Sequence, residues 1–391
     1  MKLLLKIAAV LAFSFICLTS YGQLNANNSA NDALPNIVLI VSDDHGIGDL
    51  GCYGNSAIST PNLDNLAEDG VRFTQAYCSS ASCSPSRSVI LSGLHNHANG
   101  MLGLSHRYHN FSSFDHIQTL PVLLKKLAGY KTARIGKYHV SPEEVYYFED
   151  ELQADILNPV DLAEACRPYL DEVSEDPFFL YYCTIDPHRG GEVVEDNPYK
   201  PNRFHNKDEG YEGVDPYEID SEEVIVPYYL PDNPATRAEL VQYYEAVDRM
   251  DQGVGTLIEH LKETGHYENS LIVYITDNGI AFPGAKTNIY QPAINLPCII
   301  KLPSGERANS VSDAMISWTD ITPTLLDFAG VLSESKKKIK EAYDQNKERW
   351  DNTHVPDFHG NSFKELLETG SSEGRDAIFA SHTFHEITMY Y

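Results

Sequence analysis

One short segment of the sequence contains a cysteine that could take part in a reaction. It is Cys83-Ser84-Pro85-Ser86-Arg87, followed by Ser92-Gly93. Residues 86–91 predict the first turns of a helix, which would place Cys83 at the helix N-terminus. Backbone N–H groups at that end of a helix favour anions. The alternative interpretation is a buried structural cysteine beside a proline turn. The pattern favours a reactive residue next to an anion-binding position.

Two pairs of oxygen-bearing side chains follow apolar segments. Asp43-Asp44 come after residues 37–41, and Asp277-Asn278 come after residues 271–276. Three carboxylates gathered without a cation would repel one another, so a divalent metal is expected between them. Ligands that are all oxygen favour Ca²⁺ or Mg²⁺ over zinc. Taken alone, either pair could instead be a helix cap or a loop turn.

Basic residues follow the remaining apolar segments. Lys137 and His139 come after residues 132–135, and His188 comes after residues 178–185. Any single histidine of this kind is more often a structural residue than a catalyst. In parallel sheets, however, ligands bind beyond the carboxyl ends of the strands. If these segments are strands, their polar ends are expected to meet at one site.

The apolar segments alternate with helical patterns. Thr60-Pro61 predicts a helix start, an apolar stripe begins at Leu120 and closes at Gly129, and Asn233-Pro234 opens a long helix. Continuous apolar strands separated by helices indicate an α/β fold, with a mainly parallel sheet flanked by helices. Residues 190–224 are acidic and rich in tyrosine and proline, which predicts a surface insertion near the mouth of the site.

Composition limits the possible partners. The chain has 391 residues, enough for one large α/β domain and a smaller region, and its formal net charge is −27. That charge disfavours nucleic acid or a membrane surface as a partner. It also argues against a long basic groove, so an anionic substrate would be held in a local pocket. Seven cysteines without a CxxC pair indicate neither a zinc ribbon nor a disulfide framework.

The N-terminus predicts a signal peptide over residues 1–22. Lys2 and Lys6 flank an apolar run that small residues follow, and the run is too short for a membrane anchor. The mature protein is therefore expected to be secreted or periplasmic, without a membrane partner after cleavage. The expected regions are a catalytic domain over 35–332, a connection over 333–354, and the start of a truncated C-terminal α+β region over 355–391.

The C-x-P-x-R segment at Cys83, with Ser92-Gly93 after it, resembles the sulfatase family of the alkaline phosphatase superfamily. The resemblance runs over nearly all of the mature chain, from about Pro35 to Tyr391. It implies that a separate maturation enzyme oxidises Cys83 to formylglycine. The hydrate of that aldehyde has two hydroxyls: one attacks sulfur, and the other later expels sulfate.

The resemblance also implies roles for the clustered residues. One Ca²⁺ ion would be bound by Asp43, Asp44, Asp277, Asn278 and residue 83. The implied catalytic set is Cys83, Arg87, Lys137, His139, His188 and Lys286. Arg87 and Lys137 would stabilise the hydrate and the sulfate, and His139 would be the base for elimination. His188 and Lys286 would contact sulfate and help to protonate the leaving atom. Lys286 occupies a position where relatives carry either lysine or arginine.

Several stretches resemble the branch of the family that acts on N-sulfoglucosamine. They include residues 55–61, 97–101, 110–115, 186–189, 249–255, 287–290 and 385–389. What they imply is hydrolysis of the N-sulfate on terminal glucosamine of heparan sulfate or heparin fragments. The implied sugar-binding residues are Asp186, Arg189, His385 and Glu386. The chain stops at Tyr391 inside a family motif, so it is expected to be a fragment, and a homodimer is a further possibility.

Three alternatives share parts of this pattern. An O-sulfatase acting on a glycosaminoglycan or another sulfated glycan would have the same catalytic core. A phosphodiesterase or phosphonate hydrolase of the same superfamily would share the fold. A glycan-binding protein that has lost catalysis is the alternative from another class. The complete set of candidate catalytic and metal-binding residues argues against it.

Overall fold

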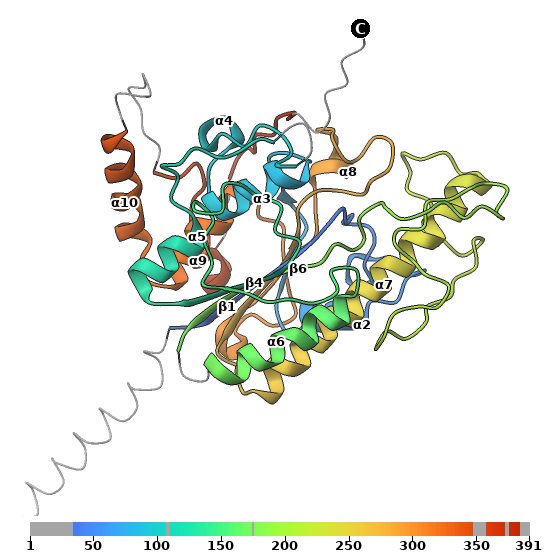
Figure 1. The fold of residues 1–391 in the computed structure, drawn as a ribbon, viewed down its shortest axis with the longest axis horizontal. Helices are drawn as coiled ribbons and strands as arrows, with labels where there is room; N and C mark the ends of the chain where they lie inside the picture. Colours follow the sequence, from blue (N-terminus) through green and yellow to red (C-terminus); the bar gives the residue numbers. More distant parts are fainter. Residues whose placement is uncertain (1–33, 107–109, 174–175, 347–356, 372–374, 384–391) are drawn as a thin grey trace, which may run out of the picture. The chain divides into compact units, whose positions relative to one another are not determined.

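The computed structural model describes residues 34–106, 110–173, 176–346, 357–371 and 375–383 (Figure 1). The predicted signal peptide and the predicted sugar-binding residues His385 and Glu386 lie outside these ranges. Among the described residues, no helix has the length and apolar character needed to cross a membrane.

An eight-stranded sheet forms the centre of the fold, in the order β5-β4-β6-β1-β7-β8-β2-β9. The strands are β1 (Asn36–Ser42), β2 (Val71–Phe73), β4 (Lys131–Gly136), β5 (Asp150–Glu151), β6 (Phe178–Cys183), β7 (Ser270–Thr276), β8 (Cys298–Lys301) and β9 (Ser310–Ser312). β5, β4, β6, β1 and β7 are all parallel, and β8 pairs antiparallel with both β7 and β2. The predicted mainly parallel sheet is confirmed. A separate pair joins β3 (Ala76–Tyr77) to β10 (Ile316–Ser317).

Helices cover both faces of the sheet, as Figure 1 shows. On one face α6 (Pro159–Val173) packs along α7 (Pro234–Glu263), and α2 (Pro61–Glu68) also contacts α7. Val38 and Ile40 of β1 belong to the apolar core on this side. On the other face, α3 (Cys83–Ser92), α5 (Leu120–Leu123) and α9 (Ile321–Phe328) contact one another. All residues of β1, β6 and β7 are buried, as expected for strands covered on both faces.

The local signals in the sequence account for several helix ends. Asn233 caps α7 by accepting a hydrogen bond from the backbone N–H of Thr236, with proline at the first helical position. The predicted stripe from Leu120 to Gly129 forms α5 and then a π-helical turn, η2 (Leu124–Ala128), which ends at Gly129 with φ 72°. The remaining helices are η1 (Gly51–Tyr53), α4 (Asn96–Asn99), α8 (Gln291–Ile294), η3 (Pro303–Gly305), η4 (Trp318–Asp320), α10 (Leu332–Gln345) and α11 (Lys364–Thr369).

The predicted insertion is a long loop. Between β6 and α7, the structure has an isolated bridge from Val193 to Asn202 and otherwise turns and irregular backbone. Phe204 and Leu230 in this region are buried in the same core cluster as α6 and α7. The loop is therefore fixed by apolar contacts at several points along its length.

Candidate active site

Four neighbouring strand ends bring the predicted site together. Asp43 follows β1, Asp277 follows β7, Lys137 follows β4, and His188 lies shortly after β6. Because these strands are parallel and adjacent, their carboxyl ends meet at one edge of the sheet. Ser42 pairs with Thr276 in the β1–β7 register, so Asp43 and Asp277 leave the sheet side by side.

The acidic cluster at this edge fits a divalent cation. Asp43, Asp44 and Asp277 are fully buried, and each has an oxygen within 4.8 Å of the others'. Asn278 is also fully buried, and its Nδ2 donates to Asp44 Oδ1 at 2.7 Å. Among the described residues, no group donates a hydrogen bond to Asn278 Oδ1. A buried amide oxygen without a donor, beside three carboxylates, is the donor set that a hard divalent cation prefers.

Each carboxylate of the cluster also contacts a basic side chain. Lys137 Nζ contacts Asp43 Oδ2, and Lys286 Nζ lies 2.6 Å from Asp44 Oδ1. Arg87 Nε donates to Asp277 Oδ2 at 2.9 Å. The site thus combines three negative and three basic groups, nearly all of them withdrawn from water.

The surroundings shift the pKa values of the lysines and histidines at the site in different directions. Burial, together with the charge of Lys286, lowers the pKa of Lys137 to about 7. Burial opposes the charged form of Lys286, but the acidic groups around it, first among them Asp44 and then Cys83 and Asp277, together outweigh burial and raise the pKa of that lysine. Burial and then the charge of Lys137 lower the pKa of His139 and of His188 well below the usual range. Both imidazoles are therefore neutral near pH 7.

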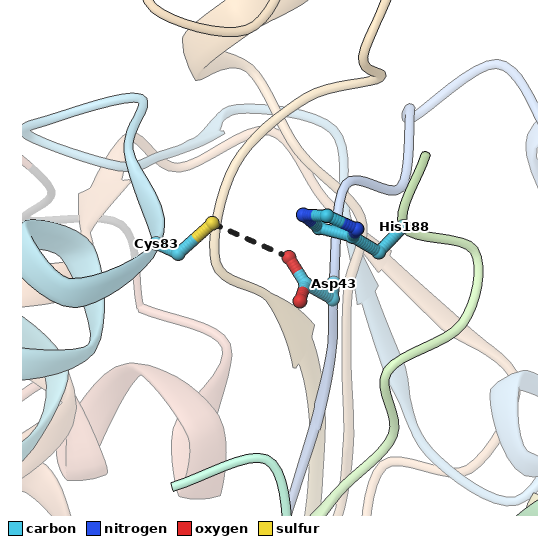
Figure 2. Close-up of side chains that lie close together, drawn as sticks. All are labelled: Asp43, Cys83 and His188. Atoms are coloured by element: carbon cyan, nitrogen blue, oxygen red, sulfur yellow. Dashed lines mark hydrogen bonds between the residues drawn. The ribbon is translucent and has the colours of Figure 1, made fainter. Parts of the chain in front are cut away.

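Cys83 is the first residue of α3, three residues before the start that the sequence predicts. Its side chain is buried, and its Sγ lies 3.6 Å from Asp43 Oδ1. Figure 2 shows the side chains of Cys83, Asp43 and His188 pointing toward one another from three different elements. Burial raises the pKa of the Cys83 thiol to about 12, so an unmodified thiol would be a poor nucleophile near neutral pH.

Two histidines join the site without a signal in the sequence. His106 Nδ1 contacts His139 Nε2. The ring of His205, in the loop before α7, stacks at 6.4 Å from that of His188. Neither residue follows a strand, so the rule that ligands gather at strand ends gives no reason to expect them.

The predicted sugar-binding residues are in different environments. Asp186 is fully buried, and its two oxygens accept bonds of 2.7 and 2.9 Å from Arg249, so the carboxylate braces the loop that carries His188. Arg189 lines an open cavity of about 470 Å³. The other titratable residues in its lining are Asp44, His188 and Lys286. This volume suits a small ligand whose anionic end reaches the cluster of charges.

Residues 381–383 approach both active-site loops. Ser381 N–H donates to Ser79 O at 2.9 Å, just before Cys83, and His382 Nδ1 lies 3.1 Å from Thr287 O, just after Lys286. The chain that leads to His385 and Glu386 therefore begins beside the site, while those two residues lie outside the described ranges.

The fold and the site define an α/β protein in which a helix N-terminus and an acidic cluster that could hold a cation meet at the carboxyl edge of a mainly parallel sheet. The sulfatase family model matches residues 35–331, and the chain belongs to the sulfatase family. Members of this family hydrolyse sulfuric esters or sulfamates.

Comparison with individual proteins gives the same family. The chain is 36% identical to human N-sulphoglucosamine sulphohydrolase over 91% of this chain and 70% of the human protein. It is 26% identical to an ulvan-active sulfatase of Formosa agariphila, over 92% of this chain and 63% of that protein. The fold matches the structure of an enzyme in complex with D-glucosamine-2-N,6-O-disulfate. The TM-score is 0.58 and the identity 22%, over 88% of this chain and 82% of the other.

Proposed function

We propose that the protein is a formylglycine-dependent sulfatase that hydrolyses the N-sulfate of terminal N-sulfoglucosamine in heparan sulfate or heparin fragments. The position of Cys83 supports the reaction: a buried residue at the start of α3, in contact with a cluster of cation ligands. The similarity to the human enzyme supports the substrate. The proposal includes export of the protein and a maturation enzyme as a transient partner.

Two groups complete the site. Formylglycine at position 83 would supply a hydroxyl nucleophile through its hydrate, at a point where burial raises the pKa of the thiol and makes it a poor nucleophile. Asp43, Asp44, Asp277 and Asn278 would hold a Ca²⁺ ion, which supplies a positive charge that stabilises negative charge on oxygen.

The remaining residues bind the substrate and move protons. The Nζ atoms of Lys137 and Lys286 contact Asp43 and Asp44 at the site. When these lysines are protonated, they neutralise the negative charge of the sulfate oxygens. His188, whose Nε2 lies 3.8 Å from Asp44 Oδ2, lines the cavity and hydrogen-bonds the leaving atom. His139 accepts a proton at Nδ1 in the elimination of sulfate, because its Nε2 contacts His106 and its buried Nδ1 has no partner among the described residues.

Sulfate release from two model sugars tests the proposal. The protein is produced together with a maturation enzyme, and the Cys83 peptide is checked by mass spectrometry for conversion to formylglycine. We expect release from N-sulfoglucosamine and little from 6-O-sulfoglucosamine. Conversion without release from the N-sulfated sugar contradicts the proposed substrate.

A second candidate is an O-sulfatase acting on a sulfated glycan, which the similarity to the ulvan-active sulfatase favours. The chemistry at residue 83 would be the same, and only contacts to the sugar would differ. Release from the O-sulfated sugar alone would establish this function and exclude the first.

A further inference from the structure

Arg189, which lines the cavity at the candidate active site, forms an ion pair with Glu239 of α7. Arg189 Nη1 donates to Glu239 Oε2 at 2.9 Å, and Nη2 donates to Oε1 at 2.6 Å. The backbone N–H of Asn202 gives Oε1 a second bond, at 3.0 Å. The Arg189 side chain is 40% exposed and that of Glu239 is 20% exposed, so water and ligands reach the pair.

Aromatic rings fix the position of the guanidinium. The rings of Phe204 and Phe282 are stacked with centroids 5.8 Å apart, and both are buried. The carbon at the centre of the Arg189 guanidinium lies 5.8 and 5.9 Å from these centroids. Rings on one side and a two-point bond to Glu239 on the other leave the arginine little freedom to turn toward a ligand.

The cavity contains three basic residues: His188, Arg189 and Lys286. Lys286 and His188 lie at Asp44, beside the proposed reacting position, so Arg189 is the remaining basic residue of the lining and the one placed to face the rest of the sugar. Glu239 cancels its charge. An arginine neutralised in this way still offers N–H donors to the cavity, which suits hydroxyl groups as acceptors, but it supplies little net charge to attract an anion. A sulfate ester is negatively charged and only accepts.

We propose that the Arg189–Glu239 pair is a specificity determinant: it favours a glucosamine that presents hydroxyls to this wall of the cavity over one that carries a second sulfate there. The inference rests on the proposed function, since it concerns the sugar that carries the reacting sulfate. Glu239 acts through Arg189 and is a positioning residue.

The test is Glu239→Gln, which keeps the shape and removes the charge. Substrates are N-sulfoglucosamine and its 2-N,6-O- and 2-N,3-O-disulfates. The quantity compared is the substrate ratio, which is kcat/KM for a disulfate divided by kcat/KM for the monosulfate. We expect this ratio to be about three- to tenfold higher in the variant than in the wild-type protein for at least one disulfate, mainly through a lower KM for that disulfate. The Glu239→Gln/Arg189→Gln double variant should lose this gain, because the freed guanidinium is its source. Ratios that stay unchanged for both disulfates overturn the proposal.

Asp232→Asn is the matched control. Asp232 binds Arg237 of α7 in the same two-point manner, at 2.6 and 2.9 Å, but Arg237, unlike Arg189, does not line the cavity. This variant should leave the substrate ratios of the wild-type protein unchanged. A similar rise in the control would show that a general change of charge causes the effect, and would overturn the proposal.

A binding measurement separates failure of this inference from failure of the proposed function. Cys83→Ala, with and without Glu239→Gln, is titrated calorimetrically with the same sugars. The binding ratio is the affinity for a disulfate divided by the affinity for the monosulfate. If no sugar is turned over but Glu239→Gln raises this ratio, the proposed function is wrong and the specificity role is retained. If the monosulfate is turned over and the binding ratio does not move, the specificity role is wrong. Absence of binding to either protein also overturns it.

Discussion

The ion pair between Asp186 and Arg249 connects the stability of the fold to the position of His188. Asp186 is fully buried and Arg249 is 4% exposed, with bonds of 2.7 and 2.9 Å between them. Arg249 also donates to Asn206 Oδ1 and to Phe204 O in the loop before α7. Asp186→Ala would leave a buried guanidinium without its counter-charge, which costs about 3–5 kcal/mol when one partner of a buried pair is removed.

Urea unfolding of the wild-type and variant proteins measures this loss directly. Asp232→Ala, which breaks the solvent-accessible Arg237–Asp232 pair, is the control and should cost far less, because solvent screens such a pair. We also expect Asp186→Ala to lower kcat, because the loop that positions His188 loses its anchor. If instead Asp186 binds the sugar, the variant would raise KM with a loss of stability below about 1 kcal/mol. That outcome would refute the positioning role.

Three further predictions concern other parts of the site and the core. Ca²⁺ at about 100 times its dissociation constant should stabilise the protein by about 2.7 kcal/mol, and Asn278→Ala should weaken this effect in calcium-dependent melting curves. Gly136→Ala should cost at least about 2 kcal/mol in urea unfolding, because φ is 78° and the new Cβ would lie 1.9 Å from Cys183 O. Burial raises the pKa of Asp49 from 3.8 to about 7 in the folded state. Its contribution to stability is therefore present below about pH 4 and is lost as the pH rises toward 7, by up to about 1.4 kcal/mol per pH unit, and Asp49→Asn should flatten this dependence.

The sequence predicts which polar residues meet at the edge of the sheet, because strand ends determine their position. Continuous apolar segments identify β1, β4, β6 and β7, and parallel pairing then places Asp43, Lys137, His188 and Asp277 at one edge. The long helix α7 is equally predictable, since Asn233 and the proline after it mark its start.

The residues that shape the cavity depend on tertiary packing and have no such local signal. Arg189 and Glu239 are 50 residues apart in the sequence, and Asp186 and Arg249 are 63 apart. Each pair forms because the loop before α7 folds back along that helix. Composition shows that charges are available in this loop but not which of them will meet. The sugar-binding role predicted for Asp186 comes from the family resemblance alone, and no pattern in the sequence indicates that its side chain pairs with Arg249.

The charges of the site explain how a protein with a net charge of −27 can bind an anion. Asp43, Asp44 and Asp277 contribute three negative charges, which Arg87, Lys137 and Lys286 balance when all three are protonated. A divalent cation held by the aspartates would leave this buried cluster with about two positive charges, and a low local dielectric strengthens their attraction for sulfate. The acidic surface acts over a longer distance and is screened by salt within about 10 Å at 0.1 M ionic strength. The acidic surface therefore repels a long polyanion lying across it more strongly than a single sulfated end group that enters the cavity. Binding of an end group is the mode expected of an enzyme that acts at chain ends.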